Sequence, residues 1–160
     1  MLRYLFAVLA IAWACVIFAL SARNADLSTE DSHGIGHIIG RILYSDFEEW
    51  PDYKQEAFED SVEHPVRKTA HVTEYIILGI FLAGAFYRKQ KGAVRFNVLV
   101  PFTVGALYAV SDEIHQYFVP GRSMQISDMA IDFVGVLIGV VIVVYIYHRR
   151  NLKKLKAVKE

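Results

Sequence analysis

Four long apolar segments constrain this 160-residue chain more than any other feature of its sequence. They cover about residues 4–20, 69–87, 96–118 and 129–147. A helix needs about 20 largely apolar residues to cross the ~30 Å hydrocarbon core of a bilayer. Each segment is predicted to be helical, because an isolated span in lipid must satisfy its own backbone hydrogen bonds. The sequence therefore predicts an all-α, integral membrane four-helix bundle, with residues 1–160 forming a single domain.

The composition agrees with a membrane protein and excludes several other classes. The chain is 54% hydrophobic, which is high for a soluble domain of this length. Cys15 is the one cysteine, so an intramolecular disulfide and a site built on several thiolates are both excluded. The sequence has no Gly-rich phosphate loop, serine-nucleophile elbow or zinc-protease helix motif. We expect the lipid bilayer as a partner and no nucleic acid.

The first apolar segment has an alternative interpretation. Arg3, an apolar stretch and the small residues Ala19, Ser21 and Ala22 also resemble a secretory signal peptide. The stretch is long for the apolar region of such a peptide, which spans about 7–15 residues. Its length favours a retained transmembrane helix.

The orientation follows from basic residues in the short flanks of the spans, which stay in the cytoplasm. Arg3 precedes the first span. A second basic group separates the second and third spans, and a basic tail at residues 148–160 follows the fourth. The members of these two groups are Arg88, Lys89, Lys91 and Arg95, then Arg149, Arg150, Lys153, Lys154, Lys156 and Lys159. The sequence thus predicts a multi-pass protein of the cell membrane with both termini in the cytoplasm, and connections 21–68 and 119–128 outside.

The first outer connection is long, acidic and rich in aromatic residues. Trp50 and Tyr53 are of the type that favours the membrane–water boundary. We expect one or two short interfacial helices here, with Pro51 and Pro65 marking helix starts or breaks. A solvated acidic loop is the alternative.

Ionisable residues inside the spans are costly, at roughly 2.5–3.5 kcal/mol each on insertion scales, and usually face a bundle interior or a wet cavity. On a helical wheel they share faces within each span. Asp128, Asp132, Gly135 and Gly139 form a narrow stripe in which the glycines allow a neighbouring helix to approach closely. The candidate pocket lies at one depth near the outer ends of three spans and comprises Lys68, His71, Glu74, Tyr75, Asp112, Glu113, His115, Gln116, Arg122, Asp128 and Asp132.

Several of these residues also have plain structural explanations. Lys68 can extend its ammonium group to the interface, and Asp128 can cap the fourth helix. Tyr75 is of a type that often packs in a core. Asp112, Glu113, His115 and Asp132 are harder to explain this way, because they must be paired, hydrated or protonated at this depth.

Three chemical hypotheses remain open for the pocket. The first is metal binding, because His71 and Glu74 lie one helical turn apart and such sites form between facing helices. Its candidate ligands are His71, Glu74, Asp112, Glu113, His115 and Asp132. The second is acid–base chemistry, with Glu113 or Asp112 as a general base and His115 or His71 as a proton relay. The third is recognition of an anion or phosphate by Lys68 and Arg122, because guanidinium groups match phosphate oxygens. The sequence does not identify a cofactor.

Four short motifs carry a resemblance to a known family. They are K-x-x-H-x-x-E-Y at 68–75, S-D-E-x-H-Q at 111–116, P-G-R at 120–122 and D-x-x-x-D-x-x-G at 128–135. In order and spacing the chain resembles the VanZ-like family, and Ser21 and Ser28 also fit. Residues 34–65 and the basic tail carry no motif that we match.

The resemblance implies a bacterial cell-envelope membrane protein that lowers susceptibility to teicoplanin. The expected ligand is a lipid-linked cell-wall precursor or the glycopeptide antibiotic itself, bound by Lys68, Glu74, Tyr75, Gln116, Arg122, Asp128 and Asp132. Two alternatives stay open. One is a membrane-embedded enzyme acting on a lipid phosphate or cell-wall precursor, and the other is a purely structural or interaction role.

Overall fold

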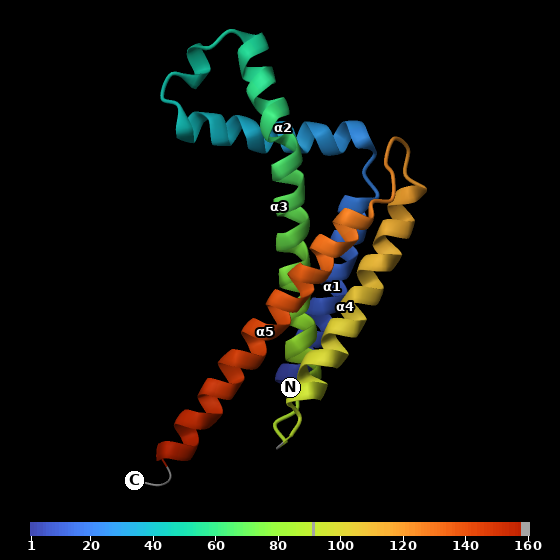
Figure 1. The fold of residues 1–160 in the computed structure, drawn as a ribbon, viewed down its shortest axis with the longest axis vertical. Helices are drawn as coiled ribbons and strands as arrows, with labels where there is room; N and C mark the ends of the chain where they lie inside the picture. The colour runs from blue at the N-terminus through green and yellow to red at the C-terminus, as the bar shows by residue number, and fades with distance from the viewer. Residues whose placement is uncertain (91, 158–160) are drawn as a thin grey trace.

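The computed structural model describes residues 1–90 and 92–157, and it is all-α throughout this part of the chain (Figure 1). Side chains are described up to Asn151. A single 3-10 turn, η1, accompanies the α-helices. In chain order the elements are α1 (Leu2–Ser21), α2 (Ala25–Leu43), η1 (Phe47–Glu49), α3 (Asp52–Phe86), α4 (Val94–Tyr117) and α5 (Ile126–Ala157).

Within the described residues, four helices are long and apolar enough to cross a membrane: α1, α3, α4 and the part of α5 from Ile126 to Asn151. The predicted all-α membrane bundle is therefore confirmed. Successive spans run in opposite directions, so the N-terminus and the C-terminal part of α5 lie at the same end of the bundle (Figure 1). The opposite end, where α2 lies, is called the α2 end below.

The first connection is more ordered than the sequence predicted. In place of one or two short helices it contains the 19-residue helix α2, the η1 turn and the first part of α3. With 35 residues, α3 is roughly 52 Å long and exceeds the hydrocarbon thickness. Pro51 caps the start of α3, as expected, but α3 continues through Pro65, so the predicted break at Pro65 is wrong.

Helix α2 crosses the upper part of α3 and is tied to it by polar side chains (Figure 1). Its start is fixed by Asn24, whose side chain accepts a hydrogen bond from the Leu27 amide at 2.9 Å. Ring nitrogens of His33 and His37 approach carboxylates of α3, at 3.1 Å from Asp60 and 2.9 Å from Glu59. These contacts lie on α3 just before Pro65, where proline removes a backbone donor, and the helix continues through this position.

One face of α2 remains apolar and exposed. Ile35, Ile38 and Ile42 recur at helical spacing on this face, with 46%, 57% and 77% of their surface accessible. A helix with one polar and one apolar face suits the boundary between lipid and water. The geometry therefore agrees with an interfacial helix, as predicted from the sequence.

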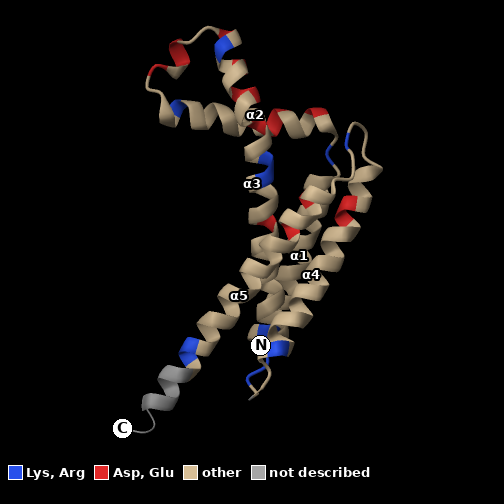
Figure 2. Ribbon diagram, in the orientation of Figure 1, with Lys and Arg blue, Asp and Glu red and all other residues tan. Residues whose placement is uncertain are grey.

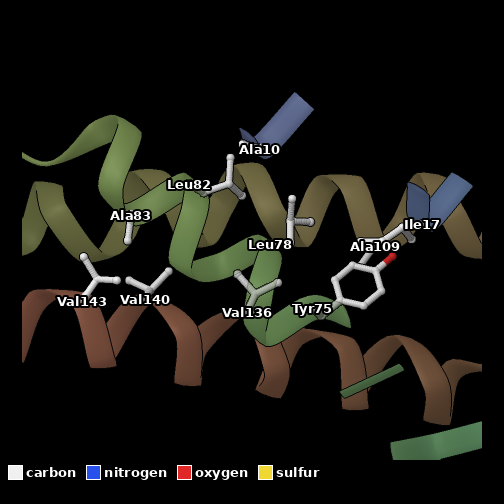
Figure 3. Close-up of a cluster of buried hydrophobic side chains, with 10 residues drawn as sticks. All are labelled: Ala10, Ile17, Tyr75, Leu78, Leu82, Ala83, Ala109, Val136, Val140 and Val143. Carbon is white, nitrogen blue, oxygen red and sulfur yellow. The ribbon is translucent and has the colours of Figure 1, made fainter. Parts of the chain in front are cut away.

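Tight packing of α3 against α5 forms the centre of the bundle (Figure 3). A Cβ atom added at Gly135 would lie 2.8 Å from the Val72 carbonyl oxygen. One added at Gly139 would overlap the Ile76 carbonyl oxygen. The two helix backbones thus approach as closely as the glycine stripe predicted. The adjoining core consists of Ala10, Ile17, Tyr75, Leu78, Leu82, Ala83, Ala109, Val136, Val140 and Val143.

Charged residues are distributed unevenly between the two ends (Figure 2). Acidic residues concentrate at the α2 end and in the α2–α3 hairpin. Arg3, Arg88 and Arg149 belong to the basic segments at the opposite end. Two residues of those basic segments, Lys91 and Lys159, lie outside the described residues.

Candidate functional site

A tight turn between α4 and α5 positions Arg122 at the α2 end. Its amide donates to the Val119 carbonyl at 3.1 Å, with Pro120 and Gly121 at the two central positions. Gly121 has a positive φ of 76°, which a type II turn requires and glycine adopts without strain. The Ala25 amide donates to the Pro120 carbonyl at 3.3 Å, so the turn is fastened to the start of α2.

The half-buried guanidinium of Arg122 contacts neutral oxygens. Nη1 donates to the Ser21 carbonyl and Nη2 to the Ser28 hydroxyl, each at 3.3 Å. Burial lowers the pKa of this guanidinium, and the nearby charge of Arg67 adds to the effect. An arginine side chain nevertheless stays protonated in proteins. A partly desolvated positive charge is thus held at the junction of α1, α2 and the α4–α5 turn.

Beneath Arg122 lies a buried polar group that joins α1 to α4, here called the α1–α4 cluster and made of Ser21, Asp112 and Gln116. The Ser21 hydroxyl donates to Oδ2 of Asp112 at 2.8 Å, and Nε2 of Gln116 donates to the same oxygen at 3.1 Å. All three side chains are buried. Arg122 reaches the same serine through its carbonyl, so Ser21 links the arginine to the buried carboxylate.

A second group, the α3–α5 cluster, comprises Lys68, His71, Asp128 and Asp132, and Glu113 of α4 lies beside the start of α5. Nζ of Lys68 lies 3.1 Å from Oδ1 of Asp128, and Nδ1 of His71 lies 3.4 Å from Oδ1 of Asp132. Asp132 is completely buried. It therefore faces a partner helix, as its place in the glycine stripe predicted. Glu113 is 1% exposed and accepts from the Gln125 amide at 2.9 Å.

The predicted site residues therefore do not form one group, and several of them lie outside both clusters. Neighbouring positions on α4 serve different helices, because Asp112 faces α1 while Glu113 reaches the start of α5. His115 stacks on Phe18 of α1, with ring centroids 4.3 Å apart. Tyr75 is fully buried in the apolar core. Within the described residues, no group of three His, Cys, Asp or Glu side chains could hold a metal ion.

A cavity of about 440 Å³ opens between α1, α2, α3 and the Arg122 turn. From the predicted set it is lined by His71, Glu74 and Arg122, and Ser21 of the α1–α4 cluster also lines it. The rest of its lining comes from residues that the sequence did not single out as a pocket: Leu20, Arg23, Ser28, Asp31, Ser32, Ile35, Val66, Arg67 and Ala70. The other predicted residues lie behind or beside this cavity.

The arginines around the cavity differ in their partners. Nη2 of Arg23 lies 3.0 Å from Oδ1 of Asp31, and Arg67 is paired with Glu63 one turn earlier on α3. The contacts of Arg122 described above are to a carbonyl and a hydroxyl oxygen. Arg122 is therefore the arginine best placed to meet an anion entering the cavity.

A family model described as VanZ/LLP1 matches residues 6–147 of this sequence. The chain belongs to the VanZ/LLP1 family. The match includes residues 34–65, for which the sequence motifs offered no resemblance, so the α2–α3 hairpin is part of the family domain. Membership identifies a multi-pass membrane protein linked to teicoplanin resistance. Comparison with curated proteins and with solved structures found no match.

The pocket predicted for this VanZ/LLP1 chain lacked two sets of residues that line the cavity: Arg67 on α3, and the serines of α2. Arg67 directly precedes the K-x-x-H-x-x-E-Y motif, and its neighbour Lys68 points instead to Asp128. Ser28 and Ser32 come from α2, which folds over the end of the bundle. Ser21, at the end of the first apolar segment, was a sequence signal that could have added this end of α1 to the predicted pocket. The contribution of α2 depends on how a 19-residue helix lies across α3, which spacing alone does not show.

Proposed function

We propose that this VanZ/LLP1 protein binds the phosphate group of a lipid-linked envelope component at the outer leaflet, and that this binding lowers teicoplanin susceptibility. Arg122 is the main phosphate ligand in this proposal, and His71 and Ser28 contribute further hydrogen bonds. The supporting observation is the half-buried Arg122 guanidinium, which borders a cavity and contacts only neutral oxygens in the described part of the chain.

A bound anion would lower the free-energy cost of partly burying the Arg122 charge. A desolvated charge is costly unless it is paired, and hydrogen bonds between ionised partners are roughly twice as strong as neutral ones. The two serine contacts of Arg122 are long, at 3.3 Å each. A phosphate oxygen offers the guanidinium shorter, charge-assisted bonds at little structural cost.

The outward orientation of the cavity rests on the distribution of Lys and Arg. The α3–α4 connection and the end of α5 carry basic residues close to the spans, and such segments remain in the cytoplasm. The α2 end then faces the outside. In this orientation Arg122 and α2 lie beyond the outer ends of the spans, on the side of the outer-leaflet head groups.

The size of the cavity favours a head group over a whole antibiotic. A volume of about 440 Å³ lies within the range of small-molecule sites, which is about 300–1,000 Å³. A glycopeptide antibiotic is much larger than the ligands of such sites. The antibiotic, which is the second ligand expected from the sequence, could insert only a part of its structure into this cavity.

The direct test is binding of a water-soluble short-chain alkyl phosphate to the purified protein in lipid nanodiscs. The wild type is compared with Arg122→Gln and with Arg41→Gln, a matched control at an exposed arginine of α2 that pairs with Glu48. We expect Arg122→Gln to weaken binding at least about tenfold, since a charged hydrogen bond contributes about 1.5–3 kcal/mol. Equal binding by all three proteins would refute the proposed role of Arg122.

A catalytic function is the second candidate, and the His71–Asp132 pair favours it. His71 lines the cavity and its Nδ1 faces the buried Asp132 carboxylate, an arrangement that orients an imidazole to accept a proton. Glu113 is a candidate general base in the sequence analysis, and Lys68 is a candidate phosphate ligand. Both residues lie outside the cavity lining. Release of inorganic phosphate from a lipid diphosphate by pure protein, lost in His71→Gln, would support catalysis. No release from a panel of lipid phosphates, with or without divalent cations, would exclude this phosphatase.

A further inference from the structure

An apolar groove adjoins the arginine-lined cavity and shares part of its wall. The groove has a volume of about 550 Å³ and runs between α1, α2 and α3. Ile35, Val66, Ala70 and Glu74 line both the groove and the cavity. One ligand can therefore occupy both spaces without passing through the protein interior.

The groove follows one face of α3 into the membrane. Its lining on α3 extends from Val62 to Ile77, a rise of roughly 22 Å along the helix axis. Trp13 of α1 closes its inner part and is fixed there by a hydrogen bond from Nε1 to the Glu74 carbonyl at 2.9 Å. The groove thus starts at the level of α2 and extends toward the hydrocarbon core.

Two threonines in the groove wall present their methyl groups rather than free hydroxyls. The Thr69 hydroxyl donates to the Pro65 carbonyl, and the Thr73 hydroxyl donates to the Thr69 carbonyl, each at 2.7 Å. Both hydroxyls are therefore satisfied by their own helix. The remaining lining is aliphatic or aromatic except at Glu74, which stands at the boundary with the cavity.

We infer that the groove holds the hydrocarbon chain of the ligand whose phosphate binds Arg122, so the ligand class is a lipid phosphate with a long aliphatic chain. This inference rests on the proposed function and adds the identity of the second half of the ligand. Continuity of the two spaces and their opposite polarity support it. The phosphate meets Arg122 at the α2 end, and the chain lies along α3 between α1 and α2.

The test measures binding of alkyl or polyprenyl phosphates of increasing chain length in nanodiscs, together with inorganic phosphate. Chain length also raises partitioning into the bilayer, so the informative comparison is between variants at the same lipid mole fraction. Thr73→Phe fills the groove at an exposed position that does not line the cavity. Thr103→Phe is the matched control, because Thr103 is an exposed threonine on α4.

Each buried methylene of the ligand chain contributes a factor of about four to affinity at most. We expect Thr73→Phe to displace two or more methylenes from the groove and so to weaken binding of the long-chain phosphate by about tenfold or more. The same variant should bind short-chain phosphate like the wild type, and Thr103→Phe should match the wild type for both. Unchanged long-chain binding in a folded Thr73→Phe protein would overturn the groove assignment while leaving the phosphate site intact. Failure of the wild type to bind any of these phosphates would overturn both proposals.

A second measurement covers the case in which Thr73→Phe does not fold. A lipid phosphate with a photoreactive diazirine in its chain is crosslinked to the wild-type protein, and the labelled residues are mapped. We expect label at Thr73 and Ile77 in excess over Thr103, and loss of this excess in Arg122→Gln. Equal labelling of the groove and of α4 would contradict a specific place for the chain.

Discussion

Nδ1 of His71 on α3 lies 3.4 Å from Oδ1 of Asp132 on α5, and the Asp132 side chain is completely buried. The pair lies about one turn before Gly135, at the start of the segment in which α5 packs closely against α3. It thus joins the wall of the cavity to the contact between α3 and α5. Removing one partner leaves a buried polar group without its neighbour.

The His71–Asp132 pair is expected to be energetically coupled. In a double-mutant cycle with His71→Ala and Asp132→Ala, the double variant should lose less stability than the sum of the single variants, by about 0.5–3 kcal/mol. The measurement is the free energy of unfolding in detergent. His64→Ala, at an exposed histidine of the same helix, serves as a control with no coupling to Asp132. Strict additivity for His71 and Asp132 would contradict the pairing.

Gly139 is expected to tolerate no larger residue. A Cβ atom at this position would overlap the Ile76 carbonyl, so Gly139→Ala must push α5 away from α3, at a cost of about 1–3 kcal/mol. Gly34→Ala is the matched control, because a Cβ atom there has open space and alanine favours a helix by about 1 kcal/mol over glycine. Thermal unfolding of the two variants should shift in opposite directions. A neutral Gly139→Ala would contradict the close helix contact.

Ser21 is expected to contribute to stability through the buried Asp112 carboxylate. Ser21→Ala removes the donor at 2.8 Å and should lower the free energy of unfolding by about 1–3 kcal/mol. Ser123→Ala changes an exposed serine of the α4–α5 connection and should have little effect. Equal unfolding temperatures for both variants would argue against the α1–α4 cluster.

The predicted orientation can be measured with single cysteines. Cys15 is first replaced by alanine, and Ser45→Cys or Gln90→Cys is then introduced at exposed positions of opposite ends. A membrane-impermeant thiol reagent should label Ser45→Cys in intact cells, and Gln90→Cys only after permeabilisation. The reverse pattern would place the arginine-lined cavity in the cytoplasm and remove the basis for an outer-leaflet ligand.

The sequence predicted the bundle because membrane spans are specified by local composition. Apolar length alone located four helices, and the glycine spacing on α5 predicted that Asp132 faces a partner helix, which is α3 in the structure. The helix ends were less predictable. Pro65 indicated a break, yet α3 is helical on both sides of it, and α2 packs against α3 just before this position.

The sequence placed the polar residues in one pocket, whereas the structure distributes them among different neighbours. Common depth placed Asp112 and Glu113 in one pocket, but adjacent helical positions differ by about 100° and face different neighbours. Arg122 of the predicted set lines the cavity, and so do Ser28 and Arg67, which were not in that set. Their contribution depends on the path of α2 over the bundle, which is a tertiary relationship with no periodic signal.

Teicoplanin and vancomycin susceptibility of cells that express the wild type, Arg122→Gln or Arg41→Gln, at matched membrane abundance, tests the central claim most directly. The account predicts that the wild type and Arg41→Gln protect selectively against teicoplanin, while Arg122→Gln gives no protection. If Arg122→Gln, at equal abundance, protects as well as the wild type does, the assignment of function to the arginine-lined cavity is contradicted.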